Sequence, residues 1–243
     1  MHEERLEFLN GQKETIIAVL HSPSSPCGKA VIVCHGLGGD KDKCWIKDMC
    51  NSLASDGIAG VRIDFSGNGE SGGRFEDMTY GKLASELKSL IDLLTKKGYN
   101  SLGLVGHSMG GAIVIIAGVA DNRVKAVVNI SGVAYPALEE HVVFVRKHFE
   151  TAFEKPKPSD RFIAELQNVD VLEAAKNLHA PLLTIHGDAD QVVPLNEGEA
   201  INEAANEPKK MVILFGCGHR LSQDQEMACE CIELSKEWMQ KHL

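Results

Sequence analysis

Ser108 is the side chain of this sequence best placed to act as a nucleophile. Residues 106–110 read Gly-His-Ser-Met-Gly; a strand-like apolar stretch (101–105) precedes them, and small apolar residues typical of a buried helix (111–117) follow. A strand that turns sharply into a helix through Gly-x-Ser-x-Gly holds its serine in a strained conformation with the hydroxyl exposed. The two glycines allow the strand and the helix to approach closely. This context predicts nucleophilic catalysis by Ser108.

The same pattern occurs a second time, around Ser71. Residues 69–73 read Gly-Glu-Ser-Gly-Gly, which also looks like the sequence around the serine of trypsin-like proteases. The flanking residues here are a glycine-rich loop and a polar segment, not a strand and a helix. A trypsin-like chain would also be all-β, with its histidine and aspartate before the serine. We therefore predict that Ser71 is a loop residue.

A serine hydroxyl is a weak nucleophile near neutral pH, so it needs a base within reach and an acid that orients the base. Two loops after predicted strands offer such groups. Residues 186–194, His-Gly-Asp-Ala-Asp-Gln-Val-Val-Pro, contain Asp188 and Asp190, and residues 216–219, Gly-Cys-Gly-His, contain His219. Because α/β sheets gather their ligands at the carboxyl ends of the strands, we expect these loops near the nucleophile.

His219 is one of ten histidines, and it lies after the last predicted strand in a glycine-flanked turn that can reach over the serine. His107 neighbours the nucleophile, and we expect its side chain to point away from the serine. His35 and His186 follow other strands and are expected to stabilise loops through hydrogen bonds. No second histidine in a matching order supports a thiol mechanism at Cys217.

Residues 35–39, His-Gly-Leu-Gly-Gly, directly follow the first apolar parallel strand. Glycines leave the backbone open there, so amide N–H groups can point at an oxyanion that develops during acyl transfer. The expected donors are the amides of Leu37 and of Met109, the residue after the nucleophile. These five residues alone are equally typical of a flexible turn, and it is the turn at Ser108 that favours an oxyanion hole.

The elements that must position these groups alternate along the chain. Two strand-like stretches, 5–9 and 15–20, flank Asn10-Gly11, which is a strong hairpin signal. Further strands are expected near 30–34, 59–65, 101–105, 125–130, 181–186 and 211–215, with helices near 43–55, 80–97, 196–206 and 223–242. This alternation predicts an α/β fold, with a mostly parallel central sheet and helices on both faces.

The alternation is interrupted between residues 131 and 180, where helical stretches occur and no strand is evident. We interpret residues 132–179 as a cap inserted into a single domain of residues 1–243. A cap above the serine would set specificity, and its aromatic side chains could line an acyl or aryl pocket or simply pack the cap on the core. The candidates are Tyr135, Phe144, Phe149, Phe153 and Phe162. The predicted substrate contacts are Tyr135 and Phe144, together with His35 and Gly36.

The composition favours a globular protein with a substantial core, since 44% of the 243 residues are apolar. The net charge of −9 disfavours nucleic acids and anionic membranes as partners. No apolar run approaches the roughly 18 residues of a membrane span, and the charged N-terminus does not look like a signal peptide, so we expect a cytoplasmic protein. The seven cysteines are expected to be free thiols, and no ligand set for a metal or an organic cofactor is evident.

In its motifs the chain resembles the α/β-hydrolase family, in the serine aminopeptidase S33-type branch that includes cinnamoyl (feruloyl) esterases and monoacylglycerol lipases. The motifs are His-Gly-x-Gly-Gly at 35–39, Asp-x-x-Gly-x-Gly-x-Ser at 64–71, Gly-His-Ser-Met-Gly-Gly at 106–111 and His-Gly-x-x-Asp-x-x-Val-Pro at 186–194. The resemblance covers nearly the whole chain outside the cap. It implies an α/β-hydrolase fold and a triad of Ser108, Asp190 and His219, with Asp190 as the acid in preference to Asp188.

The resemblance also implies an activity: a serine hydrolase that cleaves short-chain or aryl carboxylic esters through an acyl-enzyme on Ser108, without a cofactor. Monoacylglycerol lipases usually carry a glutamate where this chain has Gly39, so a lipase, lysophospholipase or acyl thioesterase is the second choice. An aminopeptidase would need carboxylates in the cap, for which Glu139 and Glu140 are candidates. A non-catalytic ligand-binding protein on the same fold is the alternative of another class.

Overall fold

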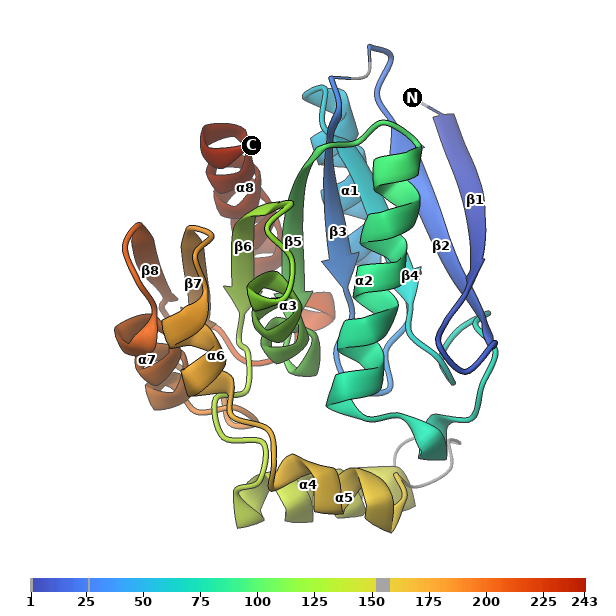
Figure 1. Ribbon diagram of the computed structural model, residues 1–243. Coiled ribbons are helices and arrows are strands. Elements are labelled where there is room, and N and C mark those ends of the chain that lie inside the picture. The colour runs from blue at the N-terminus through green and yellow to red at the C-terminus, as the bar shows by residue number, and fades with distance from the viewer. Residues whose placement is uncertain (1, 26, 152–157) are drawn as a thin grey trace.

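An eight-stranded sheet forms the centre of the molecule (Figure 1). The computed structural model describes residues 2–25, 27–151 and 158–243, with the backbone alone for residues 147–151. The strands are β1 (His2–Leu9), β2 (Thr15–Ser22), β3 (Lys29–Cys34), β4 (Ala59–Asp64), β5 (Ser101–His107), β6 (Val124–Ile130), β7 (Leu182–Gly187) and β8 (Lys209–Leu214). Their order across the sheet is β1-β2-β4-β3-β5-β6-β7-β8.

The strand directions confirm the predicted, mostly parallel sheet. β2 is antiparallel to β1 and to β4, and the pairings that follow, from β4 across to β8, are parallel. The β1–β2 hairpin encloses Asn10-Gly11 as expected, with Leu9 opposite Thr15. Because parallel strands end at one edge of a sheet, the loops after β3, β5, β7 and β8 emerge on the same side of the molecule.

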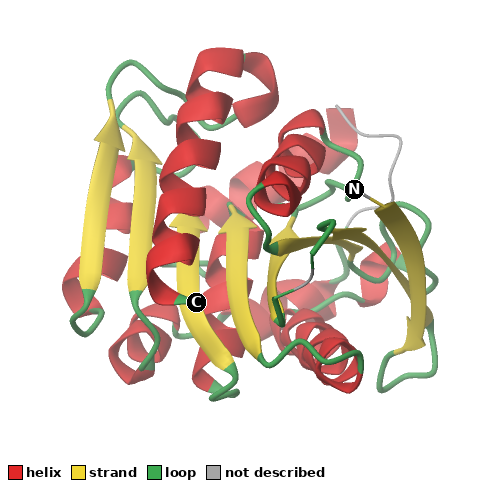
Figure 2. Cartoon of the chain, turned by 90° about the horizontal axis from the view of Figure 1, so that it is seen from above, coloured by secondary structure: helices red, strands yellow, loops and turns green. Residues whose placement is uncertain are grey.

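Helices cover both faces of the sheet (Figures 1 and 2). One face is covered by α2 (Tyr80–Lys96), α3 (Met109–Val119), α6 (Val171–Asn177) and α7 (Leu195–Ala204), and the other by α1 (Cys44–Ser55) and α8 (Gln225–His242). Side chains alternate along each strand, so β3 sends Ile32 into the apolar core beneath α2 and α3, and Val33 into the one beneath α1 and α8. This two-sided burial explains why the central strands are continuously apolar.

The segment predicted as a cap contains three helices and no strand within its described residues. Two of them, α4 (Glu139–Thr151) and α5 (Asp160–Leu166), lie across the carboxyl edge of the sheet (Figure 1). The third, α6, packs against α3 and α7 and therefore belongs to the layer of helices on the sheet. The roof above the strand ends is thus shorter than the predicted segment of residues 132–179.

Two glutamates connect this roof, formed by α4 and α5, to the rest of the molecule through hydrogen bonds. Glu197, in the first turn of α7, is buried and accepts a hydrogen bond from the Ala134 amide at 2.8 Å, while its other oxygen bonds the His141 ring of α4 at 2.5 Å. Glu165, on α5, accepts hydrogen bonds from the Tyr80 and Gly81 amides at 2.8 and 3.2 Å. These amides lie at the start of α2, where backbone N–H groups have no acceptor within the helix and the helix dipole favours an anion.

The helices within the described ranges include none with the length and apolar character that crossing a lipid bilayer demands.

Candidate active site

Ser108 lies between the last residue of β5 and the first residue of α3. Its backbone adopts φ 57° and ψ −123°, a positive φ that is uncommon for any residue but glycine and marks local strain. The flanking glycines are required sterically. A Cβ on Gly106 would lie 2.1 Å from the Gly110 carbonyl oxygen, and one on Gly110 would lie 2.6 Å from the His35 carbonyl oxygen. The predicted sharp turn is therefore present, and it projects the serine at the strand end.

The structure brings the three residues of the predicted triad together. His219 Nε2 lies 3.0 Å from Ser108 Oγ, and its Nδ1 lies 2.8 Å from Asp190 Oδ2. The second oxygen of Asp190 accepts hydrogen bonds from the amides of Val192 and Val193, both at 2.9 Å. An ionised Asp190 fixes the proton of His219 on Nδ1 and leaves Nε2 free to accept the serine proton.

The environment of Asp190 keeps its carboxyl group ionised. Burial opposes ionisation, but the hydrogen bond and charge of His219 and the two backbone amides outweigh it, so the pKa of Asp190 lies below its ordinary value. The side chain of His186 supports the same loop: its Nε2 donates to the Val193 carbonyl at 2.9 Å and lies 3.7 Å from Asp190 Oδ2.

Asp188, the rival acid, does not reach His219. It is exposed, and its Oδ1 accepts a hydrogen bond from the Gly216 amide at 2.6 Å. This bond joins the loop after β7 to the loop after β8, so Asp188 holds together the two segments that carry the acid and the base.

The loop after β3 lies directly against the nucleophile. A Cβ on Gly36 would be 3.1 Å from Ser108 Cβ, and the loop closes on itself through a 3.0 Å bond from the Gly39 amide to the Gly36 carbonyl. Among the backbone hydrogen bonds of the described residues, none uses the amide of Leu37 or Met109 as its donor. Met109 is also the first residue of α3, where the helix dipole stabilises negative charge. Both predicted oxyanion donors thus lie beside Ser108.

His35 lies in this loop, and its ring is used by the protein itself. Its Nδ1 donates to the Gly36 carbonyl at 2.8 Å, and its Nε2 accepts from the Phe65 amide at 3.1 Å. With both nitrogens bonded, the ring fixes the loop in the way predicted for a loop-stabilising histidine and has no nitrogen to offer a substrate. His35 also lines the cavity above Ser108, and the separate expectation that it contacts substrate stays a prediction.

His107 is a residue of the site that sequence reasoning missed. We expected it to point away from the serine, but it lines the same cavity, and its Nε2 donates to the His219 carbonyl at 2.8 Å. Its ring lies 4.9 Å from the His219 ring and 5.8 Å from the ring of Trp45. Burial, reinforced by the neighbouring His219, lowers the pKa of His107 to about 3, so the ring is neutral near neutral pH.

Above Ser108 lies a cavity of about 370 Å³, bounded by the strand ends below and by α4 and α5 above. Gly36, Phe144 and Phe162 line it, in agreement with their expected positions. Tyr135 does not: it is exposed and borders a separate hollow beside α5 and α6, so its predicted substrate contact is wrong. Phe153 and the side chain of Phe149 lie outside the described residues.

Two other candidates have structural roles. Ser71 Oγ donates to the Asp64 carbonyl at 2.6 Å and accepts from the Ile17 amide at 2.8 Å, so Ser71 is the loop residue that we predicted. Cys217 is partly exposed, and burial together with nearby carboxylates raises the pKa of its thiol, which disfavours a thiolate nucleophile. In the described part of the chain, no cluster of three or more His, Cys, Asp or Glu side chains could hold a metal ion.

Comparison with known proteins places this arrangement in a family. Residues 29–160, more than half of the chain, match the alpha/beta hydrolase fold family. The chain belongs to this family. It is 31% identical over 166 residues to the mitochondrial palmitoyl-protein thioesterase ABHD10 of Homo sapiens, covering 61% of this chain and 52% of that protein. It is 26% identical over 196 residues to an uncharacterized protein of Mycobacterium tuberculosis, covering 81% of this chain and 64% of that protein.

Solved structures show the same fold over nearly the full length. Est1E from Butyrivibrio proteoclasticus, solved with ferulic acid bound, aligns with a TM-score of 0.79 at 22% identity, covering 96% of this chain and 99% of Est1E. The esterase domain of a Rhodothermus marinus protein aligns with a TM-score of 0.78 at 22% identity, covering 100% and 99% of the two chains. The alignments with the thioesterase and the mycobacterial protein, in contrast, cover between about half and two thirds of those relatives' length.

Proposed function

We propose that this α/β hydrolase is a serine esterase that cleaves carboxylic esters with short-chain or aryl acyl groups. The observation that carries the proposal is the continuous hydrogen-bonded series from Ser108 Oγ through His219 to Asp190, at the floor of a cavity lined by apolar side chains. The oriented base removes the serine proton, and the cavity holds the acyl group against the serine.

In the proposed acylation step, Ser108 Oγ attacks the acyl carbon while its proton passes to His219 Nε2. Asp190 stabilises the imidazolium that forms, and the amides of Leu37 and Met109 donate to the oxyanion. The intermediate collapses with cleavage of the bond to the leaving oxygen, which takes its proton from His219. Water then attacks the acyl-enzyme, gives its proton to His219 and releases the acid, and the proton returns to Ser108.

The size and lining of the cavity support short or aryl acyl groups. Its volume of about 370 Å³ lies near the lower end of the roughly 300–1,000 Å³ of small-molecule sites. Tyr80 and Phe162 stack with ring centroids 6.2 Å apart along its wall, and Phe144 adds a third ring. Flat apolar walls of this kind suit an aryl acid, such as the ferulic acid bound to Est1E.

A thioesterase is the second candidate, because the chain is 31% identical over 166 residues to a palmitoyl-protein thioesterase. The acyl-enzyme would be the same, and only the leaving atom would change from oxygen to sulfur. An aminopeptidase has less support. Glu139 and Glu140 are exposed and do not border the cavity, and no carboxylate stands in its described lining to receive a substrate's amino group.

The partner that we propose is a small ester and not a nucleic acid, in keeping with the net charge of −9. A cytoplasmic location stays a prediction, as does membership of the S33-type branch.

A panel of substrates tests the proposal. It contains 4-nitrophenyl esters from acetate to dodecanoate, methyl ferulate, a butyryl thioester and an aminoacyl 4-nitroanilide, each assayed with the native protein and with Ser108→Ala. We expect the largest kcat/KM for short or aryl esters, and no turnover above background for Ser108→Ala. A preference for the thioester would favour the second candidate. A preference for the anilide, or full activity of the variant, would overturn the proposal.

A further inference from the structure

Glu197 orients the ring of His141 at the roof of the cavity. One oxygen of Glu197 accepts hydrogen bonds from the amides of Ala134 and Tyr135, and the other accepts from His141 Nε2 at 2.5 Å. A carboxylate can only accept hydrogen bonds, so the proton of a neutral His141 ring lies on Nε2. Nδ1 then carries a lone pair and can accept a hydrogen bond from another group.

The ring of His141 belongs to the face of α4 that borders the cavity. His141, Phe144 and Val145 are spaced at i, i+3 and i+4, which places them on one side of the helix, and all three line the cavity. The His141 side chain is only 10% exposed. Its Nδ1 has no hydrogen-bond partner among the described residues, yet it is not enclosed in the core. Since the ring borders the cavity, Nδ1 is an unpaired acceptor in the cavity wall.

The hydroxyl group of Tyr80 is a second polar group in this wall. Tyr80 is the first residue of α2, and it lines the cavity with its ring stacked on Phe162. Its Oη likewise lacks a hydrogen-bond partner within the described ranges and is not enclosed in the core. Burial, together with the charges of Glu197 and Glu165, raises the pKa of this hydroxyl, so it keeps its proton and can donate. Glu197 thus acts on both polar groups.

The surroundings of these two polar groups are apolar. The side chains that line the cavity from α4, α5 and the segment before α4 have no polar atoms: Val133, Pro136, Phe144, Val145, Phe162 and Leu166. A donor and an acceptor left unpaired in such surroundings weaken binding, so a ligand that fits well must pair with them. A single hydroxyl group pairs with both, because it can donate to Nδ1 and accept from Oη at once.

The position of His219 decides which half of the substrate reaches this end of the cavity. His219 delivers its proton to the leaving atom, so the leaving group lies on the His219 side of Ser108. The ring of His107 lies 4.9 Å from that of His219 and 5.8 Å from that of Trp45. Trp45 belongs to the core beneath α1 and α8, whereas Tyr80 belongs to the core beneath α2 and α3. The acyl group therefore extends toward Tyr80.

We propose that the substrate's acyl group carries a hydroxyl group, which donates to His141 Nδ1 and accepts from the hydroxyl of Tyr80. This inference rests on the proposed esterase function and specifies its substrate class. A phenolic acid and an ω-hydroxyalkanoic acid both present a hydroxyl group at the far end from the ester carbonyl.

Pairs of methyl esters that differ in one group of the acid test the proposal. For a phenolic acid, methyl 3-(4-hydroxyphenyl)propanoate is compared with methyl 3-(4-methylphenyl)propanoate. For an alkanoic acid, methyl 6-hydroxyhexanoate is compared with methyl heptanoate. The methyl group fills the place of the hydroxyl group but forms no hydrogen bond. We expect kcat/KM for the hydroxyl ester to exceed that of its methyl partner about tenfold in at least one pair. The pair that shows the preference identifies the kind of acid.

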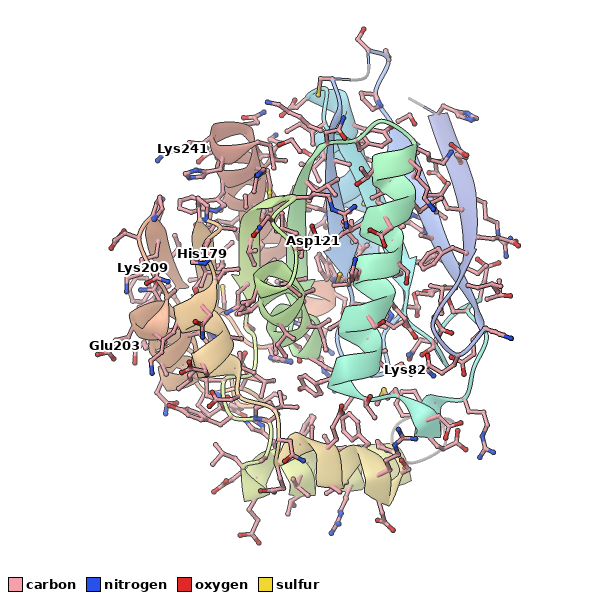
Figure 3. The ribbon with its side chains drawn as sticks, in the orientation of Figure 1. Lys82, Asp121, His179, Glu203, Lys209 and Lys241 are labelled. Atoms are coloured by element: carbon pink, nitrogen blue, oxygen red, sulfur yellow. The ribbon has the colours of Figure 1, made fainter. Side chains whose placement is uncertain are left out.

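Variants then locate the preference. Tyr80→Phe removes only the hydroxyl group, and His141→Gln removes Nδ1 but keeps an N–H that can donate to Glu197. Each should lower the hydroxyl-to-methyl ratio about threefold to tenfold. One matched control is Tyr99→Phe, because Tyr99 is buried and does not border the cavity. The other is His179→Gln, because His179 lies before β7, far from α4 and α5 (Figure 3). Both controls should leave the ratio unchanged.

Hydroxyl-to-methyl ratios near one in both pairs would overturn this inference, as would ratios that Tyr80→Phe and His141→Gln leave unchanged. Tyr80→Phe alone decides the point if His141→Gln does not fold. The proposed function would survive either negative result, because hydrolysis of the methyl partners tests it separately. If none of the esters is hydrolysed, the proposed function fails and takes this inference with it.

Discussion

Replacing Asp190 with asparagine tests the geometry of the proposed triad most sharply. One oxygen of Asp190 accepts hydrogen bonds from the amides of Val192 and Val193, so the asparagine oxygen must take that place, since an NH2 group there would face two donors. The NH2 group is then left 2.8 Å from His219 Nδ1, which must become an acceptor. The ring proton moves to Nε2, which can no longer accept the proton of Ser108.

We expect kcat of Asp190→Asn for 4-nitrophenyl butyrate to fall about 10³- to 10⁴-fold, which corresponds to about 4–5.5 kcal/mol in the activation barrier. The substrate pocket is untouched, so KM should change by less than about threefold. Steady-state kinetics measure both constants, and circular dichroism during heating checks that the isosteric variant is folded.

The control is Asp188→Asn, which alters the neighbouring aspartate. The exposed side chain of Asp188 contacts the Gly216 amide and not His219, so kcat should stay within about threefold of the native value. The reasoning is refuted if Asp190→Asn keeps more than a tenth of the native kcat, or if both variants lose activity equally.

Three further variants probe the surroundings of the triad. Burial lowers the pKa of His107 to about 3, so between about pH 6.5 and pH 3 the unfolded chain binds a proton that the folded protein does not, and stability falls as the pH falls. From pH 7 to pH 5 the native protein should lose on the order of 2 kcal/mol more unfolding free energy in urea than His107→Gln, and equal losses would contradict a ring that stays neutral in the folded protein. Gly106→Ala should yield little soluble protein, because its methyl group would lie 2.1 Å from the Gly110 oxygen, whereas Gly11→Ala, with nothing within 4 Å, should melt like the native protein. Glu197→Gln should lower the unfolding free energy by about 1–3 kcal/mol and raise KM, since an acceptor that anchors α4 is lost; unchanged values would show that the roof is held by other contacts.

The features of the site that depend on residues close together in the sequence could be predicted. The turn at Ser108 is local, because its glycines, strand and helix all lie within residues 101–117. The order of the residues along the chain and the positions of the predicted strand ends likewise indicated that the loops carrying Asp190 and His219 lie near Ser108. The choice of Asp190 over Asp188 was different, because both follow β7 closely and residue spacing alone left the two open. The structure separates them by their partners, His219 for one and the Gly216 amide for the other.

Contacts between distant segments could not be predicted in the same way. His107 reaches a carbonyl 112 positions away, and Glu197 reaches a ring 56 positions away. The cap gave the weakest prediction, because helical periodicity does not say what a helix packs on. Helical periodicity did not predict that Tyr135 faces solvent and a separate hollow while Phe162 faces the cavity. Nor did it predict that α6 packs in the layer of helices on the sheet.

Labelling with a fluorophosphonate probe tests the central claim most directly, since such a probe reacts with a serine hydroxyl only when a base and an oxyanion hole activate it. Mass spectrometry of the labelled peptides should find the adduct on Ser108, with no adduct in Ser108→Ala and slow labelling in Asp190→Asn. No adduct on the native protein, or an adduct on Ser71 instead, would contradict the account.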